Sequence, residues 1–222
     1  MCIRDRSSFY LDIIKDRLYC EEKDGLLRRS AQTALYLILD TITKLFAPIL
    51  CFTCDEIWQA MPHKNEDDGR NVVLNVMNEP FMQYALPEEE MQKWDALETL
   101  RDGVNAALES ARAQKKIGKS LEAKVTLVTK TPVQDTALEE VRQAFENQWA
   151  DLFIVSQVEV KEDKGLYDTA AETTVEGVRV LVEEAAGQKC ERCWKHDGAV
   201  GQDAAHPTLC PRCAQVVSKM GL

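Results

Sequence analysis

Four cysteines near the C-terminus have the residue type and the spacing to bind a metal ion. Cys190 and Cys193 form one Cys-x-x-Cys pair, and Cys210 and Cys213 form a second pair after 16 intervening residues. Paired thiols at this spacing are typical of structural zinc, which takes four thiolates at about 2.3 Å in a tetrahedral shell. Four cysteine ligands leave no position for a catalytic water, so the sequence predicts one structural Zn²⁺ that folds this segment. The alternative, disulfides or free thiols, is disfavoured in a chain of cytosolic character.

The other cysteines and the histidines carry no comparable signal. Cys51 and Cys54 also form a Cys-x-x-Cys pair, but they lie in an apolar segment without a second pair. We therefore expect both to be small buried residues rather than redox or metal-binding groups. The three histidines form no metal-binding pair, and the sequence contains neither a Gly-rich phosphate-binding loop nor a credible Ser/His/Asp set. The chain alone is predicted not to catalyse a reaction.

The charge distribution separates the zinc segment from the rest of the chain. The 222 residues carry a formal net charge of −10, which excludes a protein that coats nucleic acid over its whole surface. Residues 187–222 nevertheless contain five basic and three acidic side chains, with basic residues beside both cysteine pairs. This arrangement suits phosphate contact, with Trp194 available to stack on an exposed base. In the alternative, Trp194 packs on the zinc loop and the charges are merely solvated.

Composition places the chain among globular proteins. Hydrophobic residues make up 45% of the sequence, which is enough for real cores. No stretch has the length and apolar character of a bilayer span, and no signal peptide is predicted at the N-terminus. We therefore expect a cytoplasmic protein without a membrane partner.

The first part of the chain has the periodicity of helices. Apolar residues recur at three- and four-residue spacing over residues 35–46 and predict a helix with one apolar stripe, which Pro48 must interrupt. Thr53 and Glu56 have the spacing of a capping box. A new helix is therefore expected to begin there and to carry Trp58 inward.

Later segments change from helical to strand periodicity. Residues 63–86 are polar and predict a connection, and a second helical stripe follows from Pro87 to Ala111, with lysines beyond its end. From Ala123 the apolar period is two. The expected elements are strands near 125–129, 153–160 and 178–182 and a helix at 135–148.

The predicted fold class is a mainly α-helical bundle, followed by a small α+β unit and a C-terminal zinc finger with four cysteine ligands. The expected domain boundaries are residues 7–122 for the helical part, 123–186 for the α+β unit and 187–222 for the finger.

Several motifs are similar to those of one family. In the helical part they are Phe9–Tyr19, Arg28–Thr33, Leu45–Leu50 and Asp55–Trp58. Further along they are Leu100–Asn105, Leu108–Arg112, Lys116–Ala123, Gly187–Trp194 and Cys210–Cys213. Together they resemble the anticodon-binding helical domain and the C-terminal zinc finger of bacterial isoleucyl-tRNA synthetases. The helical motifs alone are shared with valyl- and leucyl-tRNA synthetases, and the finger makes the isoleucyl resemblance specific.

The resemblance extends from Ser7 to the end of the chain, with two departures. Cys51 stands where the family pattern has proline, which concerns only the local entry into a helix. Residues 1–6 do not resemble the family and are expected to be a non-native segment left by cloning or assembly.

The resemblance implies a binding role within a larger enzyme. Members of this family attach isoleucine to tRNA(Ile) with ATP, and they carry the ATP-binding catalytic domain and an editing domain upstream of the region matched here. A truncated, monomeric class I ligase is therefore expected, in which this part is inactive alone and holds the anticodon stem-loop.

Recognition of a single-stranded loop requires cations for phosphates, stacking surfaces and hydrogen-bonding groups for splayed bases. The candidate tRNA-binding residues are Arg28, Arg29, Gln32, Arg112, Lys115, Lys116, Lys119, Lys189, Arg192, Trp194, Lys195 and Arg212. For each of them the alternative is a solvated face or a charge at a helix end. Two other classes of protein stay open: a stand-alone zinc-ribbon nucleic-acid-binding protein and a protein-interaction scaffold.

Overall fold

A computed structural model describes residues 9–133, 138–145 and 148–221. The chain divides into two compact units, one formed by the segment up to Glu21 together with Leu86 and all that follows, the other by Glu22–Ala85. No helix in the described part of the chain is long and apolar enough to cross a membrane.

Two helices dominate the smaller unit, Glu22–Ala85. Helix α4 spans Leu26–Phe46 and α5 spans Cys51–Ala60, with Pro48 in the break between them as predicted. The 3₁₀ turns η2 (Val72–Leu74) and η3 (Met82–Tyr84) lie in the connection that follows. Ala47, Cys54, Trp58 and Val72 form its small core.

Two predictions about α5 were wrong in detail. The helix begins at Cys51, two residues before the predicted capping box, because the amide of Cys54 already donates to the carbonyl of Leu50 at 2.9 Å. Cys54 is buried as expected, but Cys51 is exposed because it lies on the outer side of the first turn. Trp58 points inward as predicted and is buried.

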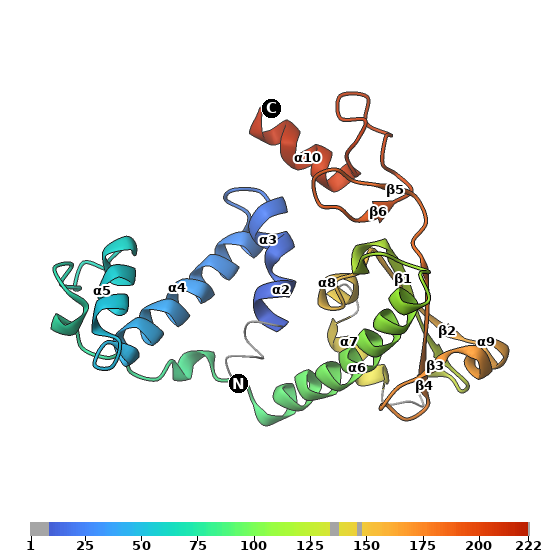
Figure 1. Ribbon diagram of the computed structural model, residues 1–222, viewed down its shortest axis with the longest axis horizontal. Coiled ribbons are helices and arrows are strands. Elements are labelled where there is room, and N and C mark those ends of the chain that lie inside the picture. The colour runs from blue at the N-terminus through green and yellow to red at the C-terminus, as the bar shows by residue number, and fades with distance from the viewer. Residues whose placement is uncertain (1–8, 134–137, 146–147, 222) are drawn as a thin grey trace. The chain divides into compact units, whose positions relative to one another are not determined.

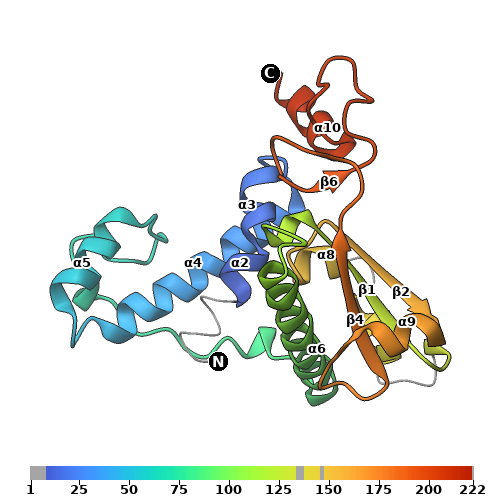
Figure 2. The ribbon, with the colours of Figure 1, turned by 45° about the vertical axis from the view of Figure 1, so that its right-hand side comes forward.

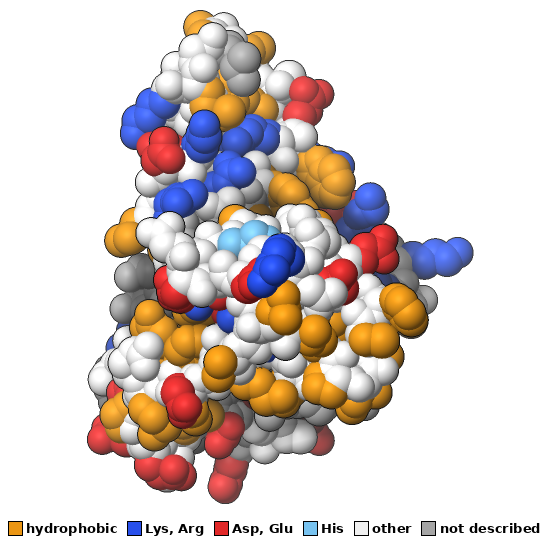
Figure 3. All heavy atoms as spheres, turned by 90° about the vertical axis from the view of Figure 1, so that its left-hand side faces the viewer, with side chains coloured by type: hydrophobic (Ala, Val, Ile, Leu, Met, Phe, Trp, Pro, Cys, Tyr) orange, Lys and Arg blue, Asp and Glu red, His pale blue; other side chains and the backbone are white. Residues whose placement is uncertain are grey.

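A buried ion pair supplements the small core of this unit. The Asp40 side chain is 0% exposed. It forms an ion pair with Lys44 at 3.0 Å and accepts a hydrogen bond from Asn78 at 2.9 Å. Much of the predicted apolar stripe of α4 is exposed, including Leu45 and Phe46. Figure 3, which faces the side of α5, shows hydrophobic side chains spread over that face.

The larger unit begins with two short helices and one long one. Helices α2 (Leu11–Ile13) and α3 (Lys15–Cys20) come first, and α6 spans Glu88–Ala113 (Figure 1). The apolar stripe predicted for α6 is confirmed. Its buried residues include Leu97, Leu100, Val104, Leu108 and Ala111.

A four-stranded sheet follows α6 in the larger unit. The 3₁₀ turn η4 (Ser120–Glu122) leads into β1 (Ala123–Thr129). The other strands are β2 (Gln157–Glu162), β3 (Ala171–Glu172) and β4 (Val178–Glu184). The strand order is β2-β1-β4-β3, with β1 parallel to β2 and antiparallel to β4. Helix α6 packs against β4 (Figure 2).

Three further helices belong to the same unit as the sheet, and one of them lies where the start of a strand was predicted. They are α7 (Leu138–Phe145), α8 (Trp149–Leu152) and α9 (Lys164–Thr169). The helix predicted at 135–148 is present over its described part, and residues 135–137 and 146–147 lie outside the described residues. The strand predicted from residue 153 begins instead at Gln157, because α8 is helical and Ile154 turns with a left-handed φ of 56°.

The zinc segment consists of a hairpin and a helix. Strand β5 (Gln188–Lys189) pairs with β6 (His196–Asp197), and α10 spans Pro211–Met220. Gly187 precedes the hairpin with φ +97°, and a Cβ there would lie 2.3 Å from the backbone of Asp197. Only glycine fits this position. The described residues are mainly helical, with a small sheet and a cysteine cluster, which agrees with the predicted fold class at the level of these contents.

Candidate metal centre and nucleic-acid interface

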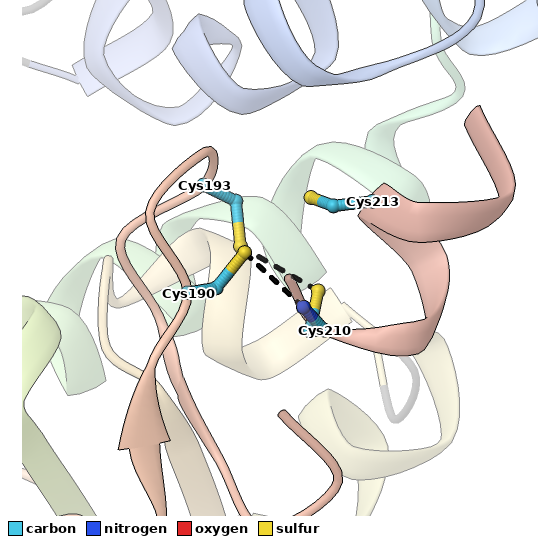
Figure 4. Close-up of side chains that lie close together, drawn as sticks. All are labelled: Cys190, Cys193, Cys210 and Cys213. Carbon is cyan, nitrogen blue, oxygen red and sulfur yellow. Dashed lines mark hydrogen bonds between the residues drawn. The ribbon is translucent and has the colours of Figure 1, made fainter. Parts of the chain in front are cut away.

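The four predicted ligand cysteines converge on one point. All four are buried, and their Sγ atoms lie within 4.8 Å of one another (Figure 4). Cys193 Sγ and Cys210 Sγ are 3.8 Å apart. A zinc ion with four thiolates at about 2.3 Å has sulfur–sulfur edges of about 3.8 Å. The cluster therefore has the donor set and the size of one structural zinc site.

Local backbone geometry brings the two cysteine pairs together. The first pair lies at the tip of the β5–β6 hairpin, where the amide of Trp194 donates to the carbonyl of Cys190 at 2.9 Å. The second pair lies at the start of α10, with Cys210 as the N-cap and Cys213 in the first turn. The Cys210 amide also donates to Cys190 Sγ at 3.3 Å. Amide donors and a helix N-terminus both stabilise thiolates.

The crowded thiols share their protons unequally. Hydrogen bonds, first from Cys213 and then from its other neighbours, lower the pKa of Cys193 to about 5 against the effect of burial. The hydrogen bond with Cys193, together with burial, raises the pKa of Cys213. Zinc binds cysteine as thiolate, so metal binding releases thiol protons and metal affinity falls in acid.

Arg212, a predicted tRNA contact, joins the finger to helix α3. Its guanidinium donates to Asp16 at 2.7 Å and to Glu21 at 2.9 Å. Burial alone would raise the pKa of Asp16, but the hydrogen bonds and charge of Arg212 outweigh it and the pKa is lowered. Arg212 and Asp16 thus form a partly buried ion pair between the finger and α3.

Two other finger cations also have partners inside the larger unit. Arg192 donates to the carbonyl of Cys20 at 2.5 Å and to that of Tyr19 at 3.4 Å. Lys195 forms an ion pair with Asp151 in α8. Three of the cations predicted to contact RNA thus hold the finger against α3 and α8.

Trp194 and Lys189 form the exposed part of the knuckle. The Trp194 side chain is 57% exposed, and Lys189 Nζ lies 5.5 Å from the centre of its ring. Because the indole is not packed away on the zinc loop, it is accessible for stacking.

A third cluster of candidates lies at the C-terminus of α6. The amide of Lys116 donates to the carbonyl of Ala111, and that of Lys115 to Arg112, which is the pattern of a Schellman motif. Lys115 takes the left-handed conformation at this cap, with φ 59°. Lys115, Lys116 and Lys119 are all exposed, and in the described part of the chain none of them forms an ion pair. Arg112 differs, because it pairs with Glu109 and donates to Ser120.

The remaining candidates lie on α4, in the smaller unit. Arg29 Nη1 donates to Gln32 Oε1 at 3.3 Å across one turn of the helix. Within the described residues, the Nε of Arg28 is buried without a hydrogen-bond partner.

The anchoring carboxylates were missed by the sequence analysis. Asp16 and Glu21 are separated from Arg212 by more than 190 residues, and Asp151 lies in a different segment from Lys195. No local spacing rule connects such pairs, so the sequence offered no signal for them. Among the candidate cations of the larger unit that the structure describes, Lys115, Lys116, Lys119 and Lys189 are exposed and form no ion pair.

Comparison with known proteins finds one family match in the N-terminal part of the chain and one over the cysteine cluster. Residues 1–127 match the family described as the anticodon-binding domain of tRNA ligase, and residues 187–216 match a zinc finger found in FPG and IleRS.

Curated relatives align with nearly the whole chain. The isoleucine–tRNA ligases of Syntrophotalea carbinolica and Gloeobacter violaceus are each 44% identical over 98% of this chain, and that of Geobacter sulfurreducens is 42% identical over 97%. The aligned region is 22%, 21% and 22% of these relatives, respectively, so the chain spans about a fifth of their length.

These matches confirm the resemblance to isoleucyl-tRNA synthetases that the sequence motifs indicated. The first family match covers more than half of the chain. The chain therefore belongs to the family of anticodon-binding domains of tRNA ligases.

Proposed function

We propose that this chain is the tRNA-binding C-terminal part of an isoleucine–tRNA ligase. The observation that carries the proposal is the joint presence of the anticodon-binding family and the four-cysteine finger in one chain that aligns with such ligases over 98% of its length. The complete enzyme attaches isoleucine to tRNA(Ile) with ATP, acts in the cytoplasm and is monomeric. This chain supplies binding rather than chemistry.

The proposed arrangement is a helical anticodon-binding domain over residues 7–122, an α+β unit over 123–186 and the finger over 187–222. In this scheme the helical bundle carries Arg28, Arg29 and Gln32 on α4. Their guanidinium and amide groups suit contact with phosphates and base edges of a splayed loop.

The α6 lysines supply the electrostatic part of the binding. Lys115, Lys116 and Lys119 are exposed and without ion pairs in the described part of the chain, so phosphate contact does not require breaking an internal bond. Their contact with RNA releases condensed counterions, which makes affinity depend on salt. The zinc finger contributes a rigid surface with Trp194 and Lys189 at its tip.

A binding titration tests the proposal. The probes are a tRNA transcript with an isoleucine anticodon, the same transcript with a substituted anticodon, and duplex DNA of equal length. We expect the isoleucine transcript to bind most tightly. The substituted anticodon should cost about 1–3 kcal/mol for each lost base contact, and affinity should fall as salt rises.

Two results would contradict the proposal. Absence of binding to every transcript would remove the tRNA-binding role. Equal affinity for tRNA and duplex DNA would instead favour a stand-alone zinc-ribbon nucleic-acid-binding protein.

A further inference from the structure

Arg192 lies between the first two ligand cysteines in the sequence, and its side chain reaches a ligand of the second pair. Its Nη1 atom donates to Cys213 Sγ at 3.9 Å. Cys213 belongs to the first turn of α10, so this contact joins the two cysteine pairs outside the metal shell itself (Figure 4). Outer hydrogen bonds of this kind orient metal ligands and tune their basicity.

The same guanidinium also binds the C-terminal end of α3. Nη1 donates to the carbonyl of Cys20 at 2.5 Å, and Nη2 donates to the carbonyl of Tyr19 at 3.4 Å. The last carbonyl groups of a helix have no partner within the helix, and a cation there also interacts favourably with the helix dipole. Cys20 Sγ in turn donates to the carbonyl of Arg192 at 3.6 Å. Arg192 and Cys20 are thus bonded in both directions.

The charge of Arg192 has no carboxylate partner in the part of the chain that the structure describes. The neighbouring cations Arg212 and Lys195 form ion pairs with carboxylates, and Arg192 forms none there. Its side chain is nevertheless partly buried. Four thiolates around one divalent ion carry a net charge of about −2. The metal centre itself therefore supplies the opposite charge for this guanidinium.

The shape of the guanidinium suits this combination of contacts. Its donors point in several fixed directions within one plane, so one side chain can reach two carbonyl groups and one sulfur atom. A lysine at the same position would keep the positive charge but would lose this fork.

We propose that Arg192 is a positioning residue of the zinc site, which donates a hydrogen bond to the Cys213 thiolate and ties that ligand to the end of α3. This role differs from the RNA contact that the sequence suggested for Arg192. It concerns metal binding and is independent of the proposed function.

The test measures metal binding by the full chain with Arg192→Gln, Arg192→Lys and Lys189→Gln. Lys189 is the matched control, because it is an exposed cation next to Cys190 and its Nζ contacts the Trp194 ring. Competition with a chelator gives the zinc affinity of each variant. Cobalt(II) is then bound in place of zinc, because its charge-transfer bands report how strongly the thiolates donate to the metal.

Arg192→Gln is expected to bind zinc about 10- to 100-fold more weakly than the wild type, which is the usual effect of losing an outer-shell partner. Its cobalt charge-transfer bands should move to lower energy, since a thiolate that loses a hydrogen bond donates more strongly. Arg192→Lys should have an intermediate affinity, because the charge remains without the fork. Lys189→Gln should match the wild type in both measurements.

Three results would overturn the proposed role of Arg192. The first is an affinity of Arg192→Gln equal to that of Lys189→Gln. The second is a weaker affinity with unchanged cobalt bands, since support of the fold alone would lower affinity without altering the thiolates. The third is loss of metal from both Arg192 variants, which would assign Arg192 to the folding of the knuckle. If only Arg192→Gln fails to bind metal, an intermediate affinity of Arg192→Lys supports the role, and a wild-type affinity contradicts the need for the fork.

Discussion

The zinc finger and the C-terminal end of α6 are both basic, but their cations are used differently. In the finger, Arg212, Arg192 and Lys195 contact carboxylates or carbonyl groups of the same unit. At the end of α6, Lys115, Lys116 and Lys119 are exposed and form no ion pair in the part of the chain that the structure describes. Clustered positive charge in a sequence thus does not by itself identify a nucleic-acid contact. The partners of each cation must be known.

The physical cost of RNA contact explains the difference. A phosphate that recruits Arg212 must first replace Asp16 and Glu21, and it would leave two carboxylates without their partner. A solvated lysine loses only its counterions, whose release favours binding. The comparison therefore separates cations that hold the finger from cations that are available to tRNA.

The largest effect is expected from removal of a zinc ligand. Cys213→Ser should reduce bound zinc from one equivalent to nearly none, because a structural zinc site contributes about 10–16 kcal/mol of apparent binding free energy. The finger should unfold and α10 should lose its helical signal. Metal analysis with circular dichroism checks the result, with Cys51→Ser as the control at an exposed cysteine. A variant that keeps one equivalent of zinc would contradict the site.

The buried pair of the smaller unit extends the comparison to a cation with almost no solvent access. Asp40→Asn should destabilise this unit by about 3–5 kcal/mol, because Lys44 would lose its main partner in a buried position. Chemical denaturation followed by tryptophan fluorescence, to which Trp58 contributes from this unit, measures the change. An unfolding free energy within about 0.5 kcal/mol of wild type would show that the pair is not a stabilising contact.

The same pair predicts a pH dependence. Burial would raise the pKa of Asp40, but hydrogen bonds from Asn78, Lys44 and Lys64 outweigh it and lower the pKa below its usual 3.8. The carboxylate then binds its proton less readily in the folded state, so its contribution is present above about pH 3.8 and is lost as pH falls through the lowered pKa. Below about pH 3.8, the free energy of unfolding should fall less steeply with decreasing pH in Asp40→Asn than in the wild type.

How much the sequence could predict depended on how local each feature is. The zinc ligands followed from two short spacings, and β1 and α6 followed from periodicity within single segments. The start of β2 could not be predicted in this way. The apolar residues from Phe153 that have strand periodicity instead form the end of helix α8 and the left-handed turn at Ile154. The contact of Arg212 with Asp16 joins residues 196 positions apart, which no pattern in the chain encodes.

A smaller change in stability is expected when the ion pairs of Arg212 with Asp16 and Glu21 are removed. Arg212→Gln should lower the free energy of unfolding of the larger unit by about 1–3 kcal/mol, since it removes charge-assisted hydrogen bonds to partly exposed partners. Zinc should also be released faster to a chelator. Lys116→Gln is the matched control and should change stability by less than about 0.5 kcal/mol. Equal stability of the two variants would remove the distinction between the regions.

The most direct measurement is the salt dependence of tRNA binding in two variants. Replacing Lys115, Lys116 and Lys119 by glutamine should reduce the slope of log K against log salt by about 2, from about 0.7 for each phosphate contact to single-stranded RNA. Arg212→Gln should leave the slope unchanged at saturating zinc, because its charge is held by Asp16 and Glu21. An unchanged slope in the lysine variant, or an equal reduction in the Arg212 variant, would contradict the account.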